Sequence, residues 1–239
     1  MSQGIGAGGG WHLTSRAHVI APSASVRALS EAQLHHLFNV RRLAPGEEVT
    51  ISDGRGGLAL ARVTEAAARR RRGAAAEELL GEVGHLRAEA PPFNLEMVLS
   101  VIDFERLSLA VRMLTELGVS RITLVHTRRS HSVAGAERRA TPERLQRIAA
   151  EAAGQCRSLF LPELGFQTME EVLGRVVVCD PAATPLISRP AALLVGPEGG
   201  FADGEIPENV PRASLPGRVL RAETAAVVAA ATALALPAA

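Results

Sequence analysis

The sequence predicts an α/β protein of two domains, and three observations support this prediction. Beyond Pro91, short apolar runs alternate with helix-like segments, the pattern of β-α-β units in a mainly parallel sheet. Before Pro91, short strand-like runs are separated by turn residues, which is typical of a small β-barrel-like module. A length of 239 residues fits two domains of unequal size. We therefore expect one domain over residues 1–90 and a second over 91–239.

Composition places the chain among ordinary globular proteins. Hydrophobic residues make up 47 % and charged residues 21 %, which excludes disorder, collagen and coiled coil as descriptions of the whole chain. The longest apolar stretch, residues 225–236, is shorter than the ~20 residues that a membrane span needs. Residues 1–10 lack the features of a secretory signal, and two cysteines are too few for a disulfide scaffold. We expect a cytoplasmic protein without a membrane span.

Arginine content alone does not indicate nucleic-acid binding here. All 26 basic residues are arginines, and the formal net charge is only +1, so a general compositional bias explains the arginines. The densest basic cluster spans residues 128–147, with six arginines against two glutamates. Such a cluster forms either a solvated helix face or a surface that contacts phosphates, and both interpretations stay open.

The first domain is expected to begin with a flexible tail over residues 1–10, because five of these residues are glycine. Residues 4–9 match the G-x-G-x-x-G pattern of dinucleotide-binding proteins, which makes a dinucleotide-dependent enzyme a rival hypothesis. That pattern works only after a strand, and no strand can precede residue 4. The tail is therefore not expected to bind a dinucleotide.

One helix and one hairpin are predicted in the rest of the first domain. Ser30 is placed to cap a helix that runs to Val40. The glycine-rich turn over 53–57 separates strand-like runs at 48–52 and 58–63, which predicts a hairpin.

The second domain contains the alternating elements. Gly118 is expected to end the first helix of this domain, because glycine readily adopts the left-handed conformation at a helix C-terminus. Strands are predicted at 95–102, 122–126, 176–179 and 191–195, and helices at 106–117, 142–156 and 223–236.

A glycine-rich loop follows the last of these strands. The loop contains Gly196, Gly199 and Gly200, where a backbone without side chains can approach a ligand closely. In parallel sheets, ligands bind at the carboxyl ends of strands. From spacing alone, a ligand-binding loop and a simple tight turn are equally good interpretations.

A second stretch, residues 215–225, leads into the terminal helix. It contains Arg218, Arg221, Glu223 and Thr224, close to a helix N-terminus that would favour anionic groups. Taken alone, this stretch is best interpreted as a capped helix.

Together, the two stretches resemble the signature of the SPOUT (α/β-knot) methyltransferases, specifically the bacterial enzymes that methylate N3 of a uridine in small-subunit ribosomal RNA. The resemblance also includes residues 115–119, 148–155 and 35–37, together with Val40, Arg42 and Gly46. It extends over most of the chain, from about Leu29 to Leu236. The two signatures are specific as a pair, and each alone would be less so.

The resemblance implies an N-terminal PUA-like RNA-binding β-barrel and a C-terminal SPOUT domain with a deep trefoil knot. It also implies a homodimer that binds S-adenosyl-L-methionine in the knot and acts on ribosomal RNA. By the same analogy the cofactor-binding residues would be Leu194, Gly196, Gly199, Gly200, Leu215, Gly217, Val219, Leu220 and Thr224.

Methylation of uridine N3 requires the loss of its proton, which suggests catalytic roles for charged residues of the two signatures. Arg221 could stabilise negative charge on the base, and Glu198 or Glu223 could accept the proton. An ion pair of Glu223 with a neighbouring arginine is an equally good interpretation. The candidate RNA contacts are Arg42, Arg129 and Arg144. Two alternatives remain: a non-catalytic RNA-binding or ribosome-assembly factor, and a SPOUT methyltransferase that modifies another RNA position.

Several positions depart from the family pattern. Pro216 separates Leu215 from Gly217, which removes one backbone N–H. Met113 occupies a position where the family usually has lysine, and Ser158 occupies one where it usually has arginine. These departures affect the expected RNA contacts more than the expected cofactor pocket. No histidines or cysteines are spaced as metal ligands, so no metal is expected, and both cysteines are expected to be buried.

Overall fold

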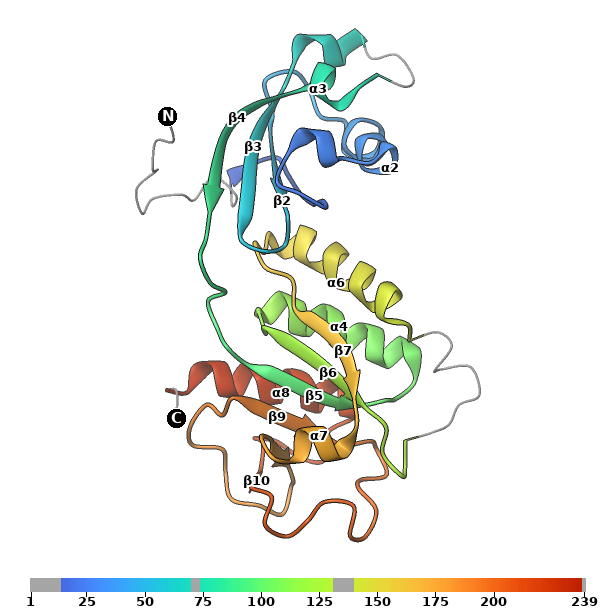
Figure 1. Cartoon of the computed structure of the whole chain (residues 1–239), viewed down its shortest axis with the longest axis vertical. Helices are drawn as coiled ribbons and strands as arrows, with labels where there is room; N and C mark the ends of the chain where they lie inside the picture. Colours follow the sequence, from blue (N-terminus) through green and yellow to red (C-terminus); the bar gives the residue numbers. More distant parts are fainter. Residues whose placement is uncertain (1–13, 70–73, 131–139, 238–239) are drawn as a thin grey trace. The chain divides into compact units, whose positions relative to one another are not determined.

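The computed structural model describes residues 14–69, 74–130 and 140–237, which form two compact units (Figure 1). Unit 1 contains the described residues up to Pro91 together with Ala153–Leu161, and unit 2 contains Pro92–Ala152 and the chain from Pro162 onward. A single boundary at residue 90 would assign Ala153–Leu161 to the second domain, whereas the structure packs this segment with the first. The predicted tail over residues 1–10 and its G-x-G-x-x-G match lie outside the described residues.

Unit 1 contains a sheet of four strands in the order β1-β2-β3-β4. β1 pairs with β2 in parallel, and the other neighbours are antiparallel. The predicted hairpin is confirmed as β2 and β3. No pairing between β1 and β4 closes the sheet within the described part of unit 1. The strands are β1 (Ala17–Ile20), β2 (Glu48–Ser52), β3 (Gly57–Val63) and β4 (Leu80–Arg87).

The predicted helix after Ser30 is confirmed as two segments of different geometry. Ser30 and Gln33 cap α2 (Glu31–His35) reciprocally through side chain and backbone. The chain then continues as a wider π-helical turn, η2 (His36–Val40), which the sequence pattern did not indicate. The remaining helical segments of unit 1 are short: η1 (Val26–Ala28), η3 (Glu65–Arg69) and α3 (Ala76–Leu79).

Partly buried polar contacts join Ala153–Leu161 to the start of unit 1. Arg157 donates from Nη2 to the main-chain oxygen of Ser15 over 2.7 Å and from Nη1 to its Oγ over 2.9 Å. The Nε2 atom of His18 lies 3.2 Å from the main-chain oxygen of Ser158 and must donate, because that oxygen can only accept. Arg157 therefore has a structural role in unit 1.

Unit 2 contains a six-stranded parallel sheet in the order β10-β8-β9-β5-β6-β7. The predicted strands are confirmed to within two residues at each end, whereas β7 and β10 were not predicted. From β5 the chain moves outward through β6 to β7, and it then crosses to the other side of the sheet for β8. The strands are β5 (Glu96–Ser100), β6 (Arg121–Val125), β7 (Glu163–Gln167), β8 (Val177–Cys179), β9 (Ala192–Val195) and β10 (Arg212–Ala213).

The three predicted helices of unit 2 are confirmed as α4 (Phe104–Leu117), α6 (Pro142–Cys156) and α8 (Ala222–Ala235). Asp103 caps the start of α4, and Gly118 ends it in the left-handed conformation, with φ of 80°. α8 packs against α4 and against β5 and β9. The shorter α7 (Met169–Leu173) packs with Val98, Val178 and Leu194 in a separate hydrophobic cluster.

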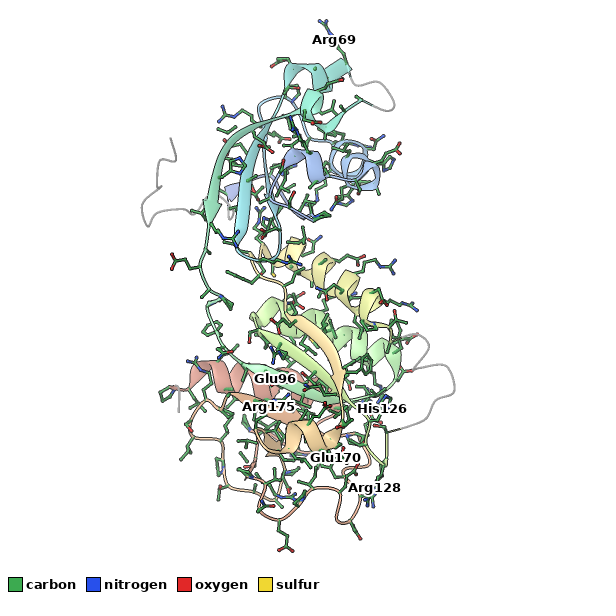
Figure 2. All side chains as sticks on the ribbon, in the orientation of Figure 1. Arg69, Glu96, His126, Arg128, Glu170 and Arg175 are labelled. Atoms are coloured by element: carbon green, nitrogen blue, oxygen red, sulfur yellow. The ribbon has the colours of Figure 1, made fainter. Side chains whose placement is uncertain are left out.

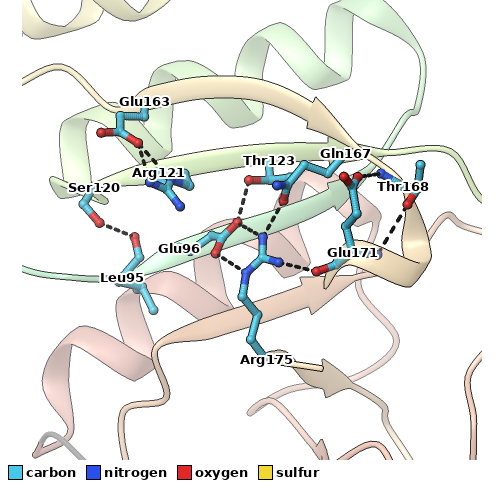
Figure 3. A network of polar contacts seen from close by, with 10 residues as sticks. All are labelled: Leu95, Glu96, Ser120, Arg121, Thr123, Glu163, Gln167, Thr168, Glu171 and Arg175. Atoms are coloured by element: carbon cyan, nitrogen blue, oxygen red, sulfur yellow. Dashed lines mark hydrogen bonds and ion pairs between the residues drawn. The ribbon is translucent and has the colours of Figure 1, made fainter. Parts of the chain in front are cut away.

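A polar network around the buried Glu96 ties α7 and the following turn to the sheet of unit 2. Figure 2 locates Glu96 and Arg175 within this unit, and Figure 3 shows that Arg175 hydrogen-bonds to Glu96, to Gln167 and to the main-chain oxygen of Glu171. Thr123 of β6 also donates to Glu96 over 2.6 Å. The network connects residues far apart in the sequence, so spacing could not reveal it.

No helix in the described ranges is both long and apolar enough to cross a bilayer.

Candidate functional site

A cavity of about 820 Å³ opens at the carboxyl ends of β8 and β9. This edge is where ligands bind in parallel sheets. Three segments line the cavity: the end of β8 with the turn that follows it, the glycine-rich loop after β9, and the stretch that precedes α8. The principal lining residues are Cys179, Asp180, Gly196, Glu198, Gly200, Phe201, Asp203, Arg212, Leu215, Gly217, Arg218, Val219 and Leu220.

The backbone of the lining segments requires glycine at specific positions. Gly200 and Gly217 adopt φ of 68° and 111°, a region that favours glycine. A Cβ at Gly200 would meet no atom within 4 Å, so an added side chain would project into open space. A Cβ at Gly196 would lie 2.8 Å from the ring of Phe201, which explains glycine there by packing.

The polar lining combines carboxylates with arginines. Arg212 donates to Asp180 over 2.9 Å. The main-chain N–H of Ala182 and the guanidinium of Arg212 both hydrogen-bond to Asp180 and hold the pKa of this carboxyl below its usual value. Burial raises the pKa of the Cys179 thiol to about 12, so this cysteine lines the cavity as a neutral group. Cys156 is exposed, so its predicted burial is wrong.

Three arginines hold the glycine-rich loop from outside the cavity. Arg106 of α4 forms an ion pair with Glu198. Arg129 donates from Nη1 to the main-chain oxygen of Gly199 over 2.9 Å. The main-chain N–H of Arg128 donates to the carboxylate of Glu205 over 2.6 Å, and Figure 2 shows where Arg128 lies.

The structure brings together six of the nine predicted cofactor residues. Gly196, Gly200, Leu215, Gly217, Val219 and Leu220 all line the cavity. Leu194, Gly199 and Thr224 do not line it: Leu194 is buried in the core, the oxygen of Gly199 accepts from Arg129, and Thr224 is exposed. The alternation of side chains along β9 directs Val195 rather than Leu194 toward the cavity.

The three predicted catalytic residues have different surroundings. Glu198 lines the cavity, with a side chain 44 % exposed. Arg221 is the N-cap of α8; it is exposed, and its side chain makes no capping hydrogen bond. Glu223 is 7 % exposed, and its Oε2 atom is buried without a hydrogen-bond partner among the described residues. Neither Arg221 nor Glu223 contributes to the cavity lining.

The three predicted RNA contacts belong to different segments of the chain. Arg42 is exposed in unit 1, with φ of 54°, a conformation uncommon for arginine. Arg129 lies against the glycine-rich loop. The guanidinium of Arg144 on α6 lies over the ring of Phe104, 4.1 Å from its centroid.

Sequence reasoning missed Asp180, Arg212 and Arg106. A signal existed for Asp180, because it directly follows a predicted strand at the edge where ligands bind. Arg106 and Glu198 are far apart in the sequence, and nothing in their spacing indicates that they pair. Within residues 14–69, 74–130 and 140–237, no three histidine, cysteine or acidic side chains are grouped to hold a metal ion.

Comparison with known proteins gives consistent matches. A family model described as an RNA methyltransferase domain matches residues 89–234, and one described as an RNA methyltransferase PUA domain matches residues 29–70. The ribosomal RNA small subunit methyltransferase E of Synechocystis sp. is 32 % identical over 237 residues, covering 88 % of this chain and 74 % of that protein. The protein of the same name from Rickettsia conorii is 24 % identical and covers 88 % of this chain and 89 % of its own length.

A solved structure agrees with the sequence matches. The ribosomal RNA small subunit methyltransferase E of Neisseria gonorrhoeae, bound to S-adenosyl methionine, superposes with a TM-score of 0.71 at 25 % identity. The superposition covers 92 % of this chain and 98 % of that one.

Proposed function

Because the chain belongs to the RNA methyltransferase family whose domain it carries at residues 89–234, we propose that it methylates N3 of a uridine in ribosomal RNA. It is an S-adenosylmethionine-dependent methyltransferase of small-subunit ribosomal RNA, as its relatives are named. The choice of uridine N3 is the part that we propose. This choice rests on the resemblance of two stretches that line the cavity, the glycine-rich loop and residues 215–225, to the signature of the uridine-N3 methyltransferases.

The size and lining of the cavity support its role as the S-adenosylmethionine site. A volume of about 820 Å³ lies within the range of cavities that hold ligands of this size. Gly200 leaves space that a side chain would fill. Glu198, Asp180 and Asp203 place carboxyl groups around this space, which complements the positive charges of the cofactor. We propose that the chain around this cavity forms the trefoil knot and that the sheet of unit 1 is part of a PUA-like barrel.

Bound S-adenosylmethionine supplies a methyl group on a positively charged sulfur, which transfers by in-line displacement. The residues of this chain therefore contribute mainly by positioning. The glycine-rich loop and the stretch before α8 form two walls of the cavity, so a base at its mouth would lie between them. Holding N3 at about 3 to 3.5 Å from the methyl carbon would supply much of the rate enhancement.

The proton on uridine N3 must leave as the new N–C bond forms. Glu198 is a better acceptor than Glu223 in this geometry, because Glu198 lines the cavity whereas Glu223 is buried and does not. The guanidinium of Arg221 is exposed at the start of α8 and has no ion-pair partner among the described residues. We assign to Arg221 the stabilisation of negative charge on the base oxygens.

Unit 1 supplies RNA affinity in this proposal, since its residues 29–70 match an RNA methyltransferase PUA domain. Arg42, in unit 1, and Arg144, in unit 2, remain the proposed contacts to RNA phosphates. We also propose a homodimer and a cytoplasmic location, where the ribosomal RNA substrate resides.

The test is methylation of small ribosomal subunits from a strain that lacks this protein. The purified protein and S-adenosylmethionine are added, and nucleosides are then analysed by mass spectrometry against an N3-methyluridine standard. We expect N3-methyluridine to form. Methylation of a ribose or of another base atom would overturn the choice of N3, and RNA binding without S-adenosylmethionine binding would identify a non-catalytic RNA-binding factor instead.

A further inference from the structure

The glycine-rich loop after β9 is held by hydrogen bonds that come from elements outside the cavity. Arg129 follows β6, and its Nη1 donates to the main-chain oxygen of Gly199 over 2.9 Å. Its aliphatic stem also covers that residue, because a Cβ at Gly199 would lie 3.8 Å from Cδ of Arg129. Arg129 therefore contacts the loop both through a charge-assisted hydrogen bond and through packing.

Arg128, the residue before Arg129, holds the part of the loop that follows Gly200. The main-chain N–H of Arg128 donates to Oε1 of Glu205 over 2.6 Å, and Oε2 of Glu205 accepts from the N–H of Ala202 over 2.8 Å. Arg106 of α4 pairs with Glu198 on the other side of Gly199. The loop is thus attached at several points to the segment after β6 and to α4.

This attachment matters because the attached residues border the cavity. Glu198, Gly200, Ala202 and Asp203 all line it, whereas Gly199 does not. The oxygen of Gly199 faces Arg129, and its two neighbours contribute to the cavity wall. A loop that is already ordered loses less conformational entropy when a ligand binds.

We propose that Arg129 is a positioning residue that holds the glycine-rich loop in the conformation able to bind S-adenosylmethionine. This inference rests on the proposed function, which supplies the ligand, and it differs from the role of an RNA contact that the sequence predicts for Arg129. The hydrogen bond to Gly199 uses one of the five guanidinium N–H groups of Arg129, so the two roles are separated by measuring cofactor affinity and RNA affinity independently.

The two roles predict opposite results for Arg129→Ala in the full-length protein. If Arg129 positions the loop, the Kd for S-adenosylmethionine should rise about fivefold to tenfold, as expected for the loss of one solvent-exposed hydrogen bond. The Kd for ribosomal RNA and its dependence on salt should change little. Calorimetry with S-adenosylmethionine and titration of labelled RNA at several salt concentrations measure both quantities.

Two further variants separate positioning from general destabilisation. Arg129→Lys can still donate one hydrogen bond to Gly199, so it should recover part of the cofactor affinity. Arg121→Ala removes an equal charge from the opposite end of β6, where Arg121 pairs with exposed Glu163, and it should keep wild-type cofactor affinity. Hydrogen exchange without cofactor should be faster at residues 198–205 in Arg129→Ala than in either wild type or Arg121→Ala.

Several outcomes would overturn the inference. Wild-type cofactor affinity in Arg129→Ala, combined with weaker RNA binding and a smaller salt dependence, would make Arg129 a phosphate contact instead. Equal cofactor losses in Arg129→Ala and Arg121→Ala would show a non-specific effect. If the wild-type protein itself does not bind S-adenosylmethionine, the proposed function fails, and this result is distinguishable because it appears before any substitution is made.

Discussion

Arg175 and Glu96 form a two-point ion pair in which Nε donates to Oε2 and Nη2 donates to Oε1, each over 2.9 Å (Figure 3). The Glu96 side chain is only 10 % exposed. Burial alone would raise the pKa of Glu96, but hydrogen bonds from Arg175 and Thr123 outweigh burial and hold this pKa below its ordinary value. The folded protein therefore binds a proton at Glu96 less readily than the unfolded chain does.

The first prediction concerns the pH dependence of stability. Because the pKa is lowered on folding, the contribution of Glu96 is complete above its ordinary value of 4.5 and is lost as the pH falls below that value. Glu96→Gln should lower the free energy of unfolding by about 1–3 kcal/mol at pH 7. The difference from wild type should shrink at pH 4. Urea denaturation of both proteins at the two pH values measures this difference.

The matched control for this prediction is Glu163→Gln, which removes one charge from the exposed Arg121–Glu163 pair. The Glu163 side chain is 72 % exposed, so the variant should cost at most about 1 kcal/mol. A gap between wild type and Glu96→Gln that stays constant from pH 7 to pH 4 would contradict the proposed linkage.

The second prediction concerns Gly200. Gly200→Val should weaken S-adenosylmethionine binding by about tenfold or more, because φ of 68° disfavours valine and the change of backbone would occur at a residue that lines the cavity. Gly174→Val is the control: Gly174 has an ordinary φ of −71° and open space around its Cβ position. Calorimetry measures cofactor affinity, and a thermal melt checks the fold. Wild-type affinity in Gly200→Val would remove the loop from the cofactor site.

Most elements of unit 2 were predictable because local patterns determine them. The apolar runs that became β5, β6 and β9 are buried on both faces of a parallel sheet, which makes them continuous rather than alternating, and β8 is buried at its central residue, Val178. β7 was not predicted: Glu163, Phe166 and Gln167 are exposed at the edge of the sheet, and this strand lacks a continuous apolar run.

The candidate site was only partly predictable for a different reason. Glycines of the two signatures revealed the two main walls of the cavity, because backbone conformation limits which residues fit there. Contacts such as Arg106–Glu198 and Arg129–Gly199 depend on how distant segments pack together, and no local pattern specifies them. The same reason explains why Ala153–Leu161 could not be assigned to unit 1 from sequence.

The third prediction concerns Arg42 as an RNA contact of unit 1. Arg42→Gln should weaken binding to ribosomal RNA and reduce the slope of log K against log salt by about one, because one phosphate contact is lost. Arg27→Gln is the control, since the charge of Arg27 is already balanced by Glu77 at 3.0 Å. Equal salt slopes for wild type and Arg42→Gln would exclude a phosphate contact at this position.

The fourth prediction concerns a homodimer formed through α8. This helix is apolar around nearly its whole circumference, yet only one side of it is buried, with Ala226, Ala229, Ala230 and Ala233 fully covered. Ala231 is exposed on α8, so Ala231→Arg should shift the mass measured by light scattering from about twice 25.1 kDa to the monomer value. Ala68→Arg, at an exposed site of unit 1, should leave the dimer intact. A wild-type monomer at micromolar concentration would contradict this prediction.

The last prediction concerns Arg221, which occupies an unfavourable place for a cation. A helix N-terminus carries partial positive charge, so an arginine at the N-cap of α8 gains nothing from the helix dipole. Two carboxylates are candidate ion-pair partners of Arg221, and neither pairs with it: Glu198 pairs with Arg106, and Glu223 is buried. This arrangement leaves contact with the substrate as the best reason for an arginine at position 221.

Arg221→Ala should therefore lower kcat by about 100-fold or more, as expected when one preorganised donor is lost, with little change in cofactor affinity or melting temperature. Arg221→Lys keeps the charge without the planar fork of donors, so its kcat should be intermediate. Single-turnover methylation, calorimetry and a thermal melt on the three proteins separate the possible roles. A structural arginine would lower melting temperature, cofactor affinity and activity together, and full activity of Arg221→Ala would exclude any role in the reaction.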